Sequence, residues 1–267
     1  GSMRGFPLDT AKELLRTLMA DLKPTDTFNV LFFSGGSDLL SRSPLTATPR
    51  NIERALKMID RQEGGGGTEL LPALQRAMAL PAEENGWSRS FIVVTDGYIS
   101  GETELFEYIR ANLGRANVFS FGIGSSVNRF LIDGVAKAGL GEPFVVLGPG
   151  QSLEVANKLR EYVRSPVLTD VQVTFDGFDA YDVEPTSFPD VLADRPIVVH
   201  GKWKGKAGGS IGVRGVSGTG AFQQKIVVAP GMADEANDPL KFLWARTRVS
   251  NISDFTERGG LDDRAKR

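Results

Sequence analysis

The chain has 267 residues, with 31 Lys and Arg against 33 Asp and Glu, a formal net charge of -2 and no cysteine. This length suffices for one large domain or two modest ones. The near-neutral charge gives no overall field that would recruit nucleic acid or an anionic membrane. The absence of cysteine excludes disulfides, thiolate zinc sites and a cysteine nucleophile. No apolar run approaches the roughly 20 residues of a membrane span.

Residues 8–166 alternate helical patterns with short apolar runs. Apolar residues at three-and-four spacing predict the first helix, and an apolar run stopped by glycine predicts the first strand. In chain order, the pattern predicts a helix at 8–22, a strand at 27–36, helices at 49–63 and 69–80, a strand at 90–97, a helix at 103–114, a strand at 116–124, a helix at 129–139, a strand at 143–148 and a helix at 152–166. Continuously apolar strands between helices indicate a doubly wound, mostly parallel α/β sheet with helices on both faces. Ligands of such folds bind beyond the carboxyl ends of the strands.

The pattern changes after Pro166. Shorter runs with turn residues between them predict a small antiparallel sheet, followed by a helix and a polar tail. The strands are expected at 170–175, 195–205, 209–218 and 221–230, the helix at 238–252 and the tail at 256–267. We expect two domains, 1–165 and 166–267. Trp203 and Trp244 are expected to lie in the core of the second.

Two loops that follow predicted structural elements carry candidate functional side chains. Asp96 comes directly after the apolar run 91–94, and Gly97 permits a sharp turn beside it. Thr68 ends the sequence GGGGT, whose glycines allow the backbone to approach a ligand closely. Each residue also has a purely structural interpretation. Asp96 could cap the next turn, and Thr68 stands at the expected N-cap of helix 69–80.

The opening sequence, Gly1-Ser2-Met3-Arg4-Gly5, has two interpretations. It could be a cloning remnant before an initiator methionine, or the end of a metal-binding loop. Together with GGGGT and TDG, in this order and spacing, it resembles the von Willebrand factor A (vWA) domain with its metal-ion-dependent adhesion site. In that family the first strand ends in Asp-x-Ser-Gly-Ser-Met-x-Gly, and residues 1–5 match the second half of this motif. The resemblance covers residues 1 to about 165 and favours a native origin of the opening residues.

The resemblance implies a protein-binding adhesion module and no enzyme. Ser2, Thr68 and Asp96 match its metal ligands, and the ion would be Mg²⁺ or, alternatively, Mn²⁺ or Ca²⁺, which take oxygen ligands. An Asp or Glu side chain of a protein partner would complete the coordination. The family's Asp and first Ser would precede residue 1. We therefore expect weak or absent cation binding by these 267 residues, whose N-terminal ammonium would also repel the ion.

The C-terminal part narrows the resemblance further. The sequence FPDVLADRPIVVHGKWKG, a glycine-rich hairpin and FLWARTRV are similar to the segment after the vWA domain in inter-alpha-trypsin inhibitor heavy chains and their bacterial relatives. Those proteins carry a VIT domain ahead of the vWA domain. The resemblance implies a bacterial member, truncated at its N-terminus, from an extracytoplasmic or cell-envelope setting.

The resemblance also implies a central strand ahead of residue 1, between the strands at 27–34 and 90–95. An empty slot there would leave buried backbone groups unpaired, at about 1–3 kcal/mol for each group. A domain with a stability of about 5–15 kcal/mol cannot absorb such a cost. We therefore expect the gap to be closed by direct pairing of 27–34 with 90–95, or by a segment of the C-terminal domain or of a second molecule, as in a dimer or a segment swap.

Other functions remain as alternatives. A glycine-rich loop beside a parallel sheet could bind the phosphate of a nucleotide in an α/β enzyme, but GGGGTEL lacks the Lys-Ser/Thr of a P-loop, and no G-x-G-x-x-G follows a strand. A Ser-His-Asp hydrolase is disfavoured because the only histidine, His200, is expected on a solvent-facing strand. A structural module without a functional metal site is the last alternative.

Overall fold

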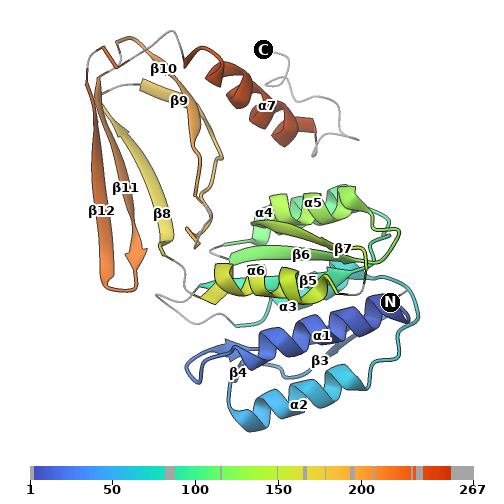
Figure 1. Ribbon diagram of the computed structural model, residues 1–267. Helices are drawn as coiled ribbons and strands as arrows, with labels where there is room; N and C mark the ends of the chain where they lie inside the picture. The colour runs from blue at the N-terminus through green and yellow to red at the C-terminus, as the bar shows by residue number, and fades with distance from the viewer. Residues whose placement is uncertain are drawn as a thin grey trace. The chain divides into compact units, whose positions relative to one another are not determined.

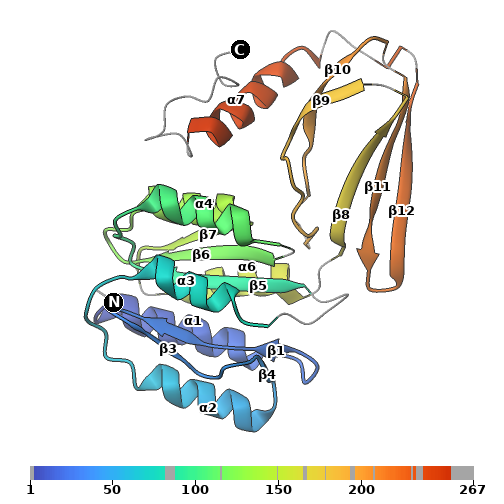
Figure 2. The ribbon, with the colours of Figure 1, turned by 180° about the vertical axis from the view of Figure 1, so that it is seen from behind.

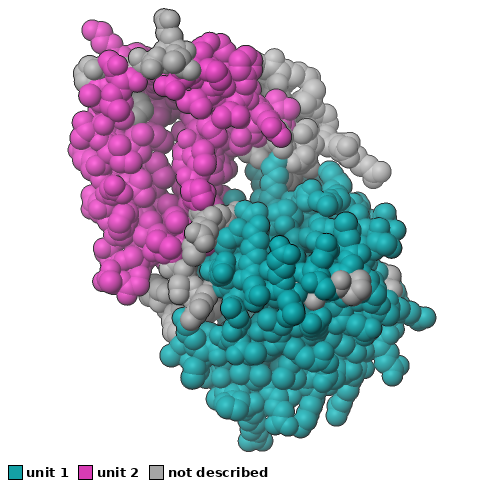
Figure 3. Space-filling view, in the orientation of Figure 1, with its two compact units in different colours: residues 1–164 teal, residues 165–267 magenta. Residues whose placement is uncertain are grey.

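The structure is a computed structural model that describes residues 3–81, 88–114, 116–148, 150–164, 167–177, 179–192, 196–206, 208–229, 231–232 and 237–253. The chain divides into two compact units, residues 1–164 and 165–267, which Figure 3 colours separately. Each unit has its own sheets and helices. No helix within the described ranges combines the length and the apolar character needed to cross a membrane.

Unit 1 is built around the parallel sheet β5–β6–β7, with α4 and α5 on one face and α1 and α6 on the other (Figures 1 and 2). Every residue of β6 is buried, because β6 lies between two strands and under helices on both faces. Its Phe119 and Phe121 are fully buried, together with Phe106 of α4. The predicted mostly parallel α/β fold is therefore confirmed. The elements are α1 (Phe6–Ala20), α2 (Pro49–Asp60), α3 (Leu70–Met78), α4 (Glu102–Asn112), α5 (Arg129–Ala138), α6 (Ser152–Arg164), β5 (Arg89–Thr95), β6 (Ala116–Ile123) and β7 (Leu140–Val146).

The predicted strand at 27–36 forms two short strands, each in its own antiparallel pair. β1 (Thr27–Phe28) pairs with β4 (Leu45–Thr46), and β2 (Leu31–Phe33) pairs with β3 (Ser37–Leu39), both antiparallel. Asn29 separates them. Its Oδ1 accepts hydrogen bonds from the backbone N–H groups of Val30 (2.9 Å) and Ser41 (3.3 Å), and its Nδ2 donates to the Ser41 carbonyl oxygen (2.7 Å). The side chain therefore takes the place of a strand ladder at this position.

Two of the expected ways to close the central gap, direct pairing of 27–34 with 90–95 and a strand of the C-terminal domain, are not found in the described part of the chain, and closure by a second molecule stays a prediction. In the described part, β2 pairs only with β3, β5 pairs only with β6, and no described strand of unit 2 joins either edge. The two strand pairs instead pack with α1 and α2 in a separate core, formed by Met19, Phe28, Val30, Leu40, Ala47, Ala55 and Ile59.

Unit 2 contains an antiparallel sheet and a two-stranded ribbon. In the sheet, β11 (Gly209–Ser217) lies between β8 (Thr169–Asp176) and β12 (Gly220–Val228). In the ribbon, β9 (Asp179–Glu184) pairs with β10 (His200–Lys204). The antiparallel, β-rich character expected after residue 166 is confirmed, whereas β9 was not predicted, because its alternate acidic residues hide the strand pattern.

Trp203 is 49% exposed, so the prediction that it lies in the core is wrong. It is adjacent to Lys202 on β10, and neighbouring residues of a strand point to opposite faces. Lys202 contacts α7 (Leu240–Ser253) through Trp244. Helix α7 therefore covers the face of β10 that carries Lys202 and leaves the face that carries Trp203 exposed. Trp244, on the covered side, is half-buried.

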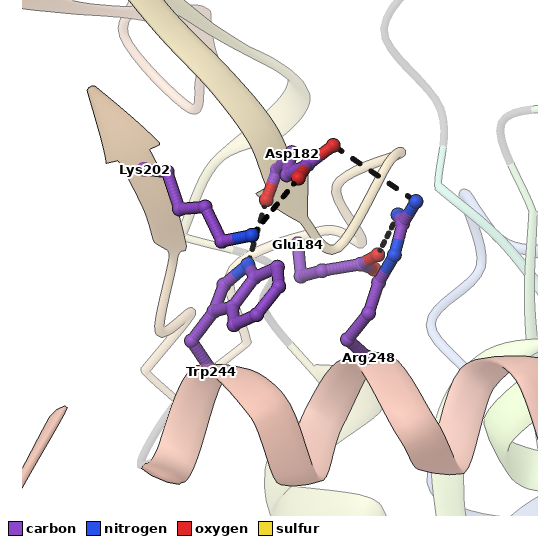
Figure 4. Close-up of polar contacts among 5 residues, drawn as sticks. All are labelled: Asp182, Glu184, Lys202, Trp244 and Arg248. Atoms are coloured by element: carbon purple, nitrogen blue, oxygen red, sulfur yellow. Dashed lines mark hydrogen bonds and ion pairs between the residues drawn. The ribbon is translucent and has the colours of Figure 1, made fainter. Parts of the chain in front are cut away.

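Five side chains hold α7 on the ribbon (Figure 4). Trp244 donates its indole N–H to the carbonyl oxygen of Asp182 at 2.8 Å. The Lys202 ammonium lies 3.8 Å from the centre of the Trp244 ring and 3.3 Å from an Asp182 carboxylate oxygen. One guanidinium nitrogen of Arg248 donates to Glu184 at 2.6 Å, and this bond raises the pKa of Arg248. We call these five residues the α7 cluster.

Candidate metal centre

The glycine-rich loop 64–67 packs against the start of the described chain. A Cβ atom at Gly64, where φ is 74°, would lie 1.8 Å from the carbonyl oxygen of Met3, so only glycine permits this approach. On the other side of the loop, the backbone N–H of Glu69 donates to the carbonyl oxygen of Ser34, at the end of β2, at 3.0 Å. These two contacts hold the loop between the N-terminal segment and β2.

Thr68 is half-buried and lies between this loop and α3. The helix begins at Leu70 and has Glu69 as its N-cap, whose side chain forms no capping hydrogen bond. The interpretation of Thr68 as the N-cap is therefore wrong, because the helix begins one residue later than the pattern predicts. The Thr68 hydroxyl is not used to cap α3.

Asp96 is the first residue after β5 and is half-buried. Thr95 closes the turn after β5: its hydroxyl oxygen accepts a hydrogen bond from the Gly97 N–H at 3.1 Å. Gly97 has a φ of 96°, and a Cβ there would lie 3.2 Å from the backbone nitrogen of Asn128. A residue with a side chain would therefore push this turn away from the start of α5.

The N-terminal segment 3–7 contacts two of the loops at the carboxyl end of the sheet, an edge that we call the rim. Met3 lies against Gly64, and Pro7 lies against Gly124, where a Cβ would be 3.6 Å from the proline Cγ. Gly124 directly follows β6, whose Gly122 pairs with Thr95 of β5. The loops that carry Thr68 and Asp96 therefore both lie near segment 3–7 at the carboxyl end of the sheet. The third predicted ligand, Ser2, lies outside the described residues.

Asn128, which sequence reasoning missed, belongs to the same rim and contacts Glu102. The Asn128 Oδ1 accepts from the backbone N–H of Leu131 at 3.2 Å and caps α5, and its Nδ2 donates to a Glu102 carboxylate oxygen at 3.4 Å. An Asn directly before an apolar helical pattern is a recognisable N-cap signal. Its contacts with Gly97 and Glu102 depend on the fold and leave no local signal.

The donor atoms at this rim suit a hard cation. The described residues contain no group of three or more His, Cys, Asp or Glu side chains able to hold a metal ion. The Asp96 carboxylate and the Thr68 hydroxyl could serve a cation together with water, a set that suits Mg²⁺, which keeps several waters beside one or two carboxylates. Asp96 would be the single carboxylate among the two proposed ligands, because Glu102 of the same rim accepts a hydrogen bond from Asn128, and one negative charge favours weak binding.

Comparison with known proteins identifies the family. The family described as the von Willebrand factor type A domain matches residues 1–142, more than half of the chain. The chain belongs to this family. A von Willebrand factor A domain-containing protein of Dictyostelium discoideum is 28% identical over 174 residues, which cover 65% of this chain and 19% of that protein. Inter-alpha-trypsin inhibitor heavy chain H2 of Sus scrofa is 26% identical over 215 residues, which cover 76% of this chain and 23% of the heavy chain.

The vWA chain therefore spans about a fifth of the length of these relatives. A solved structure, the von Willebrand factor type A protein from Catenulispora acidiphila, matches it with a TM-score of 0.62 at 18% identity. The match covers 83% of this chain and 62% of the other. At this identity the likeness shows the fold, and the vWA assignment of the α/β unit agrees with it.

Proposed function

We propose that this vWA domain binds a protein partner through a divalent cation at the carboxyl end of its sheet. Thr68 and Asp96 are the proposed ligands among the described residues, and Ser2 is the proposed third ligand. The observation that supports the proposal is that segment 3–7 lies against Gly64, in the loop before Thr68, and against Gly124, which follows β6 next to the strand that leads to Asp96. The family and its relatives give the coarser assignment, a protein-interaction module.

Each residue of the rim has a distinct role in this proposal. The Asp96 carboxylate supplies the negative charge, and the Thr68 hydroxyl adds a neutral oxygen ligand. The hydrogen bond from the Gly97 N–H to the Thr95 hydroxyl oxygen spans Asp96 and therefore fixes the orientation of its backbone. When bound, a divalent cation with an open coordination position attracts a carboxylate from the partner. Since that contact is a coordination bond, recognition is directional and requires the cation.

The same rim argues against a phosphate-binding enzyme. Glu69, at the N-terminus of α3, is exposed, and its carboxylate repels an anion at the position where a helix would otherwise attract one. We therefore propose a binding module without catalytic turnover. An extracytoplasmic location is part of the same proposal.

A short peptide with a single Glu tests the proposal, with the matched Gln peptide as its control. We expect the Glu peptide to shift the amide NMR signals of Glu69 and Gly97 in the presence of Mg²⁺. The shifts should vanish on chelation with EDTA, with the Gln peptide and in Asp96→Asn. They should persist in Asp176→Asn, which neutralises an exposed carboxylate of unit 2.

Two results would contradict the proposal. Equal binding of the Glu peptide in Mg²⁺ and in EDTA would exclude a cation bridge. Shifts of the same signals by inorganic phosphate, without Mg²⁺, would favour the phosphate-binding alternative.

A further inference from the structure

β12 is a free strand edge in unit 2. It pairs with β11 over nine consecutive residues, from Gly220–Ser217 to Val228–Gly209, without a register shift. Among the described strands, none pairs with its other side. Eight of its nine residues are exposed. A long, regular edge of this kind is a template for another strand, because a row of backbone N–H and C=O groups faces solvent.

The opposite edge of the same sheet is irregular. β8 shifts register against β11 between Arg214 and Val216, and Asp170 has a φ of 54°. Next to it, Leu168 forms a bridge with Val191. Irregularities of this kind prevent a strand edge from pairing with the edge of another sheet. β12 has none of them, contains no proline and carries a single charged residue, Lys225.

The sheet is also amphipathic. Ile226 and Ile211 lie directly opposite each other on β12 and β11, and Ile211 lies opposite Phe175 on β8. Phe222 shares this face, which Gln224 interrupts between Phe222 and Ile226 on β12. Phe222 and Ile226 remain 37% and 47% exposed. The other face is more polar: it carries Arg214 of β11 between Gln172 and Gln223, although Ala221 and Val227 of β12 also lie there.

We infer that β12 pairs with β12 of a second copy of this chain, which makes one six-stranded antiparallel sheet from two three-stranded sheets. A two-fold axis normal to the sheet makes the two strands antiparallel and keeps both apolar faces on the same side. The backbone groups of the two edges then satisfy each other, as in other cases of strand addition. This interface belongs to unit 2 and is independent of the proposed metal centre.

The sequence of β12 selects one register for this pairing. With Gln224 on the two-fold axis, Phe222 faces Ile226 of the partner copy, Ala221 faces Val227, and Lys225 faces Gln223. Apolar residues then meet apolar residues, and all nine positions pair. With Lys225 on the axis, two ammonium groups would face each other, which destabilises a strand pair. A shift by one residue would place the apolar face of one copy beside the polar face of the other.

Charge substitutions at Gln223 test the inference, because each dimer contains two symmetry-related pairs in which Gln223 of one copy faces Lys225 of the other. We expect Gln223→Lys to raise the dimer dissociation constant about 10-fold, Gln223→Glu to lower it, and the double variant Gln223→Lys/Lys225→Glu to restore dimerisation. Sedimentation equilibrium of the full 267-residue chain measures all three. Gln172→Lys and Gln172→Glu are matched controls, since Gln172 flanks the same Arg214 from the β8 edge.

A cysteine at the two-fold axis gives a second measurement. The chain contains no cysteine, so an oxidised Gln224→Cys variant can form a disulfide only between copies. Directly opposite residues of antiparallel strands have Cα atoms about 4.5–5.5 Å apart, within the range of a disulfide. We expect a covalent dimer for Gln224→Cys and a monomer for Gln172→Cys. A monomer at all concentrations, association beyond two copies, or equal effects at Gln223 and Gln172 would overturn the inference.

Discussion

The backbone N–H of Glu69 donates to the carbonyl oxygen of Ser34 at 3.0 Å, which joins the start of α3 to the end of β2. Thr68 lies immediately before this bond, so its backbone position is fixed by a strand of the fold as well as by its own loop. If Thr68 is a metal ligand, as proposed, it needs little reordering when the cation binds.

Gly64→Ala should disturb this loop. The new Cβ would lie 1.8 Å from the Met3 carbonyl oxygen, at a φ of 74° that disfavours a side chain. We expect the free energy of unfolding to fall by about 1–3 kcal/mol, measured by urea denaturation of unit 1. Gly67→Ala is the matched control, because a Cβ there meets no atom within 4 Å. Equal losses for the two variants would contradict the close approach at Gly64.

Arg248→Met should weaken the docking of α7. The Glu184 carboxylate is almost fully buried, and the substitution removes its guanidinium partner, 2.6 Å away. We expect a loss of about 3 kcal/mol in the unfolding of unit 2, followed by tryptophan fluorescence. The double variant with Glu184→Gln should cost less than the sum of the single changes. Arg246→Met, at an exposed position of the same helix, should have little effect.

The pair Glu53–Lys57 gives a prediction about pH. The hydrogen bond and the charge of Lys57, at 2.7 Å, lower the pKa of Glu53 below its ordinary value. Because the folded-state pKa is the lower one, the pair stabilises the fold above the unfolded-state pKa, and this contribution is lost as pH falls through the folded-state pKa. Lys57→Met should raise the titration midpoint of the Glu53 carboxyl group, measured by NMR. An unchanged midpoint would show that the pair does not form in solution.

Local patterns predicted the elements that are buried or strongly periodic. β6 is apolar along nearly its whole length and is buried along all of it. The helix predicted at 103–114 ends at Asn112, and Gly114 follows it with a φ of 58°, which suits glycine after a helix C-terminus. Such features depend on the chain within a few residues, so the sequence shows them directly.

Features that depend on distant partners were not predictable. Asn29 divides a predicted strand because its side chain bonds to Ser41, which lies in another loop. Trp203 was expected in the core, but α7 covers only the opposite face of β10. In the candidate site, Thr68 and Asp96 were singled out beside glycines, and the resemblance to the vWA domain gave them the role of metal ligands, which stays a prediction. The role of Asn128 as the neighbour of Gly97 depends on the packing of α5 and could not be predicted.

A titration with Mn²⁺, observed through the NMR signals of the backbone amides, tests the metal centre most directly. The paramagnetic ion broadens signals close to it and detects weak binding. If Thr68 and Asp96 hold one cation, the amide signals of Glu69 and Gly97 will lose intensity together, at lower Mn²⁺ than the signal of Gly212 in unit 2, and Asp96→Asn will abolish both losses. Broadening of only one of the two signals, or of neither before Gly212, would show that the two loops do not share a cation.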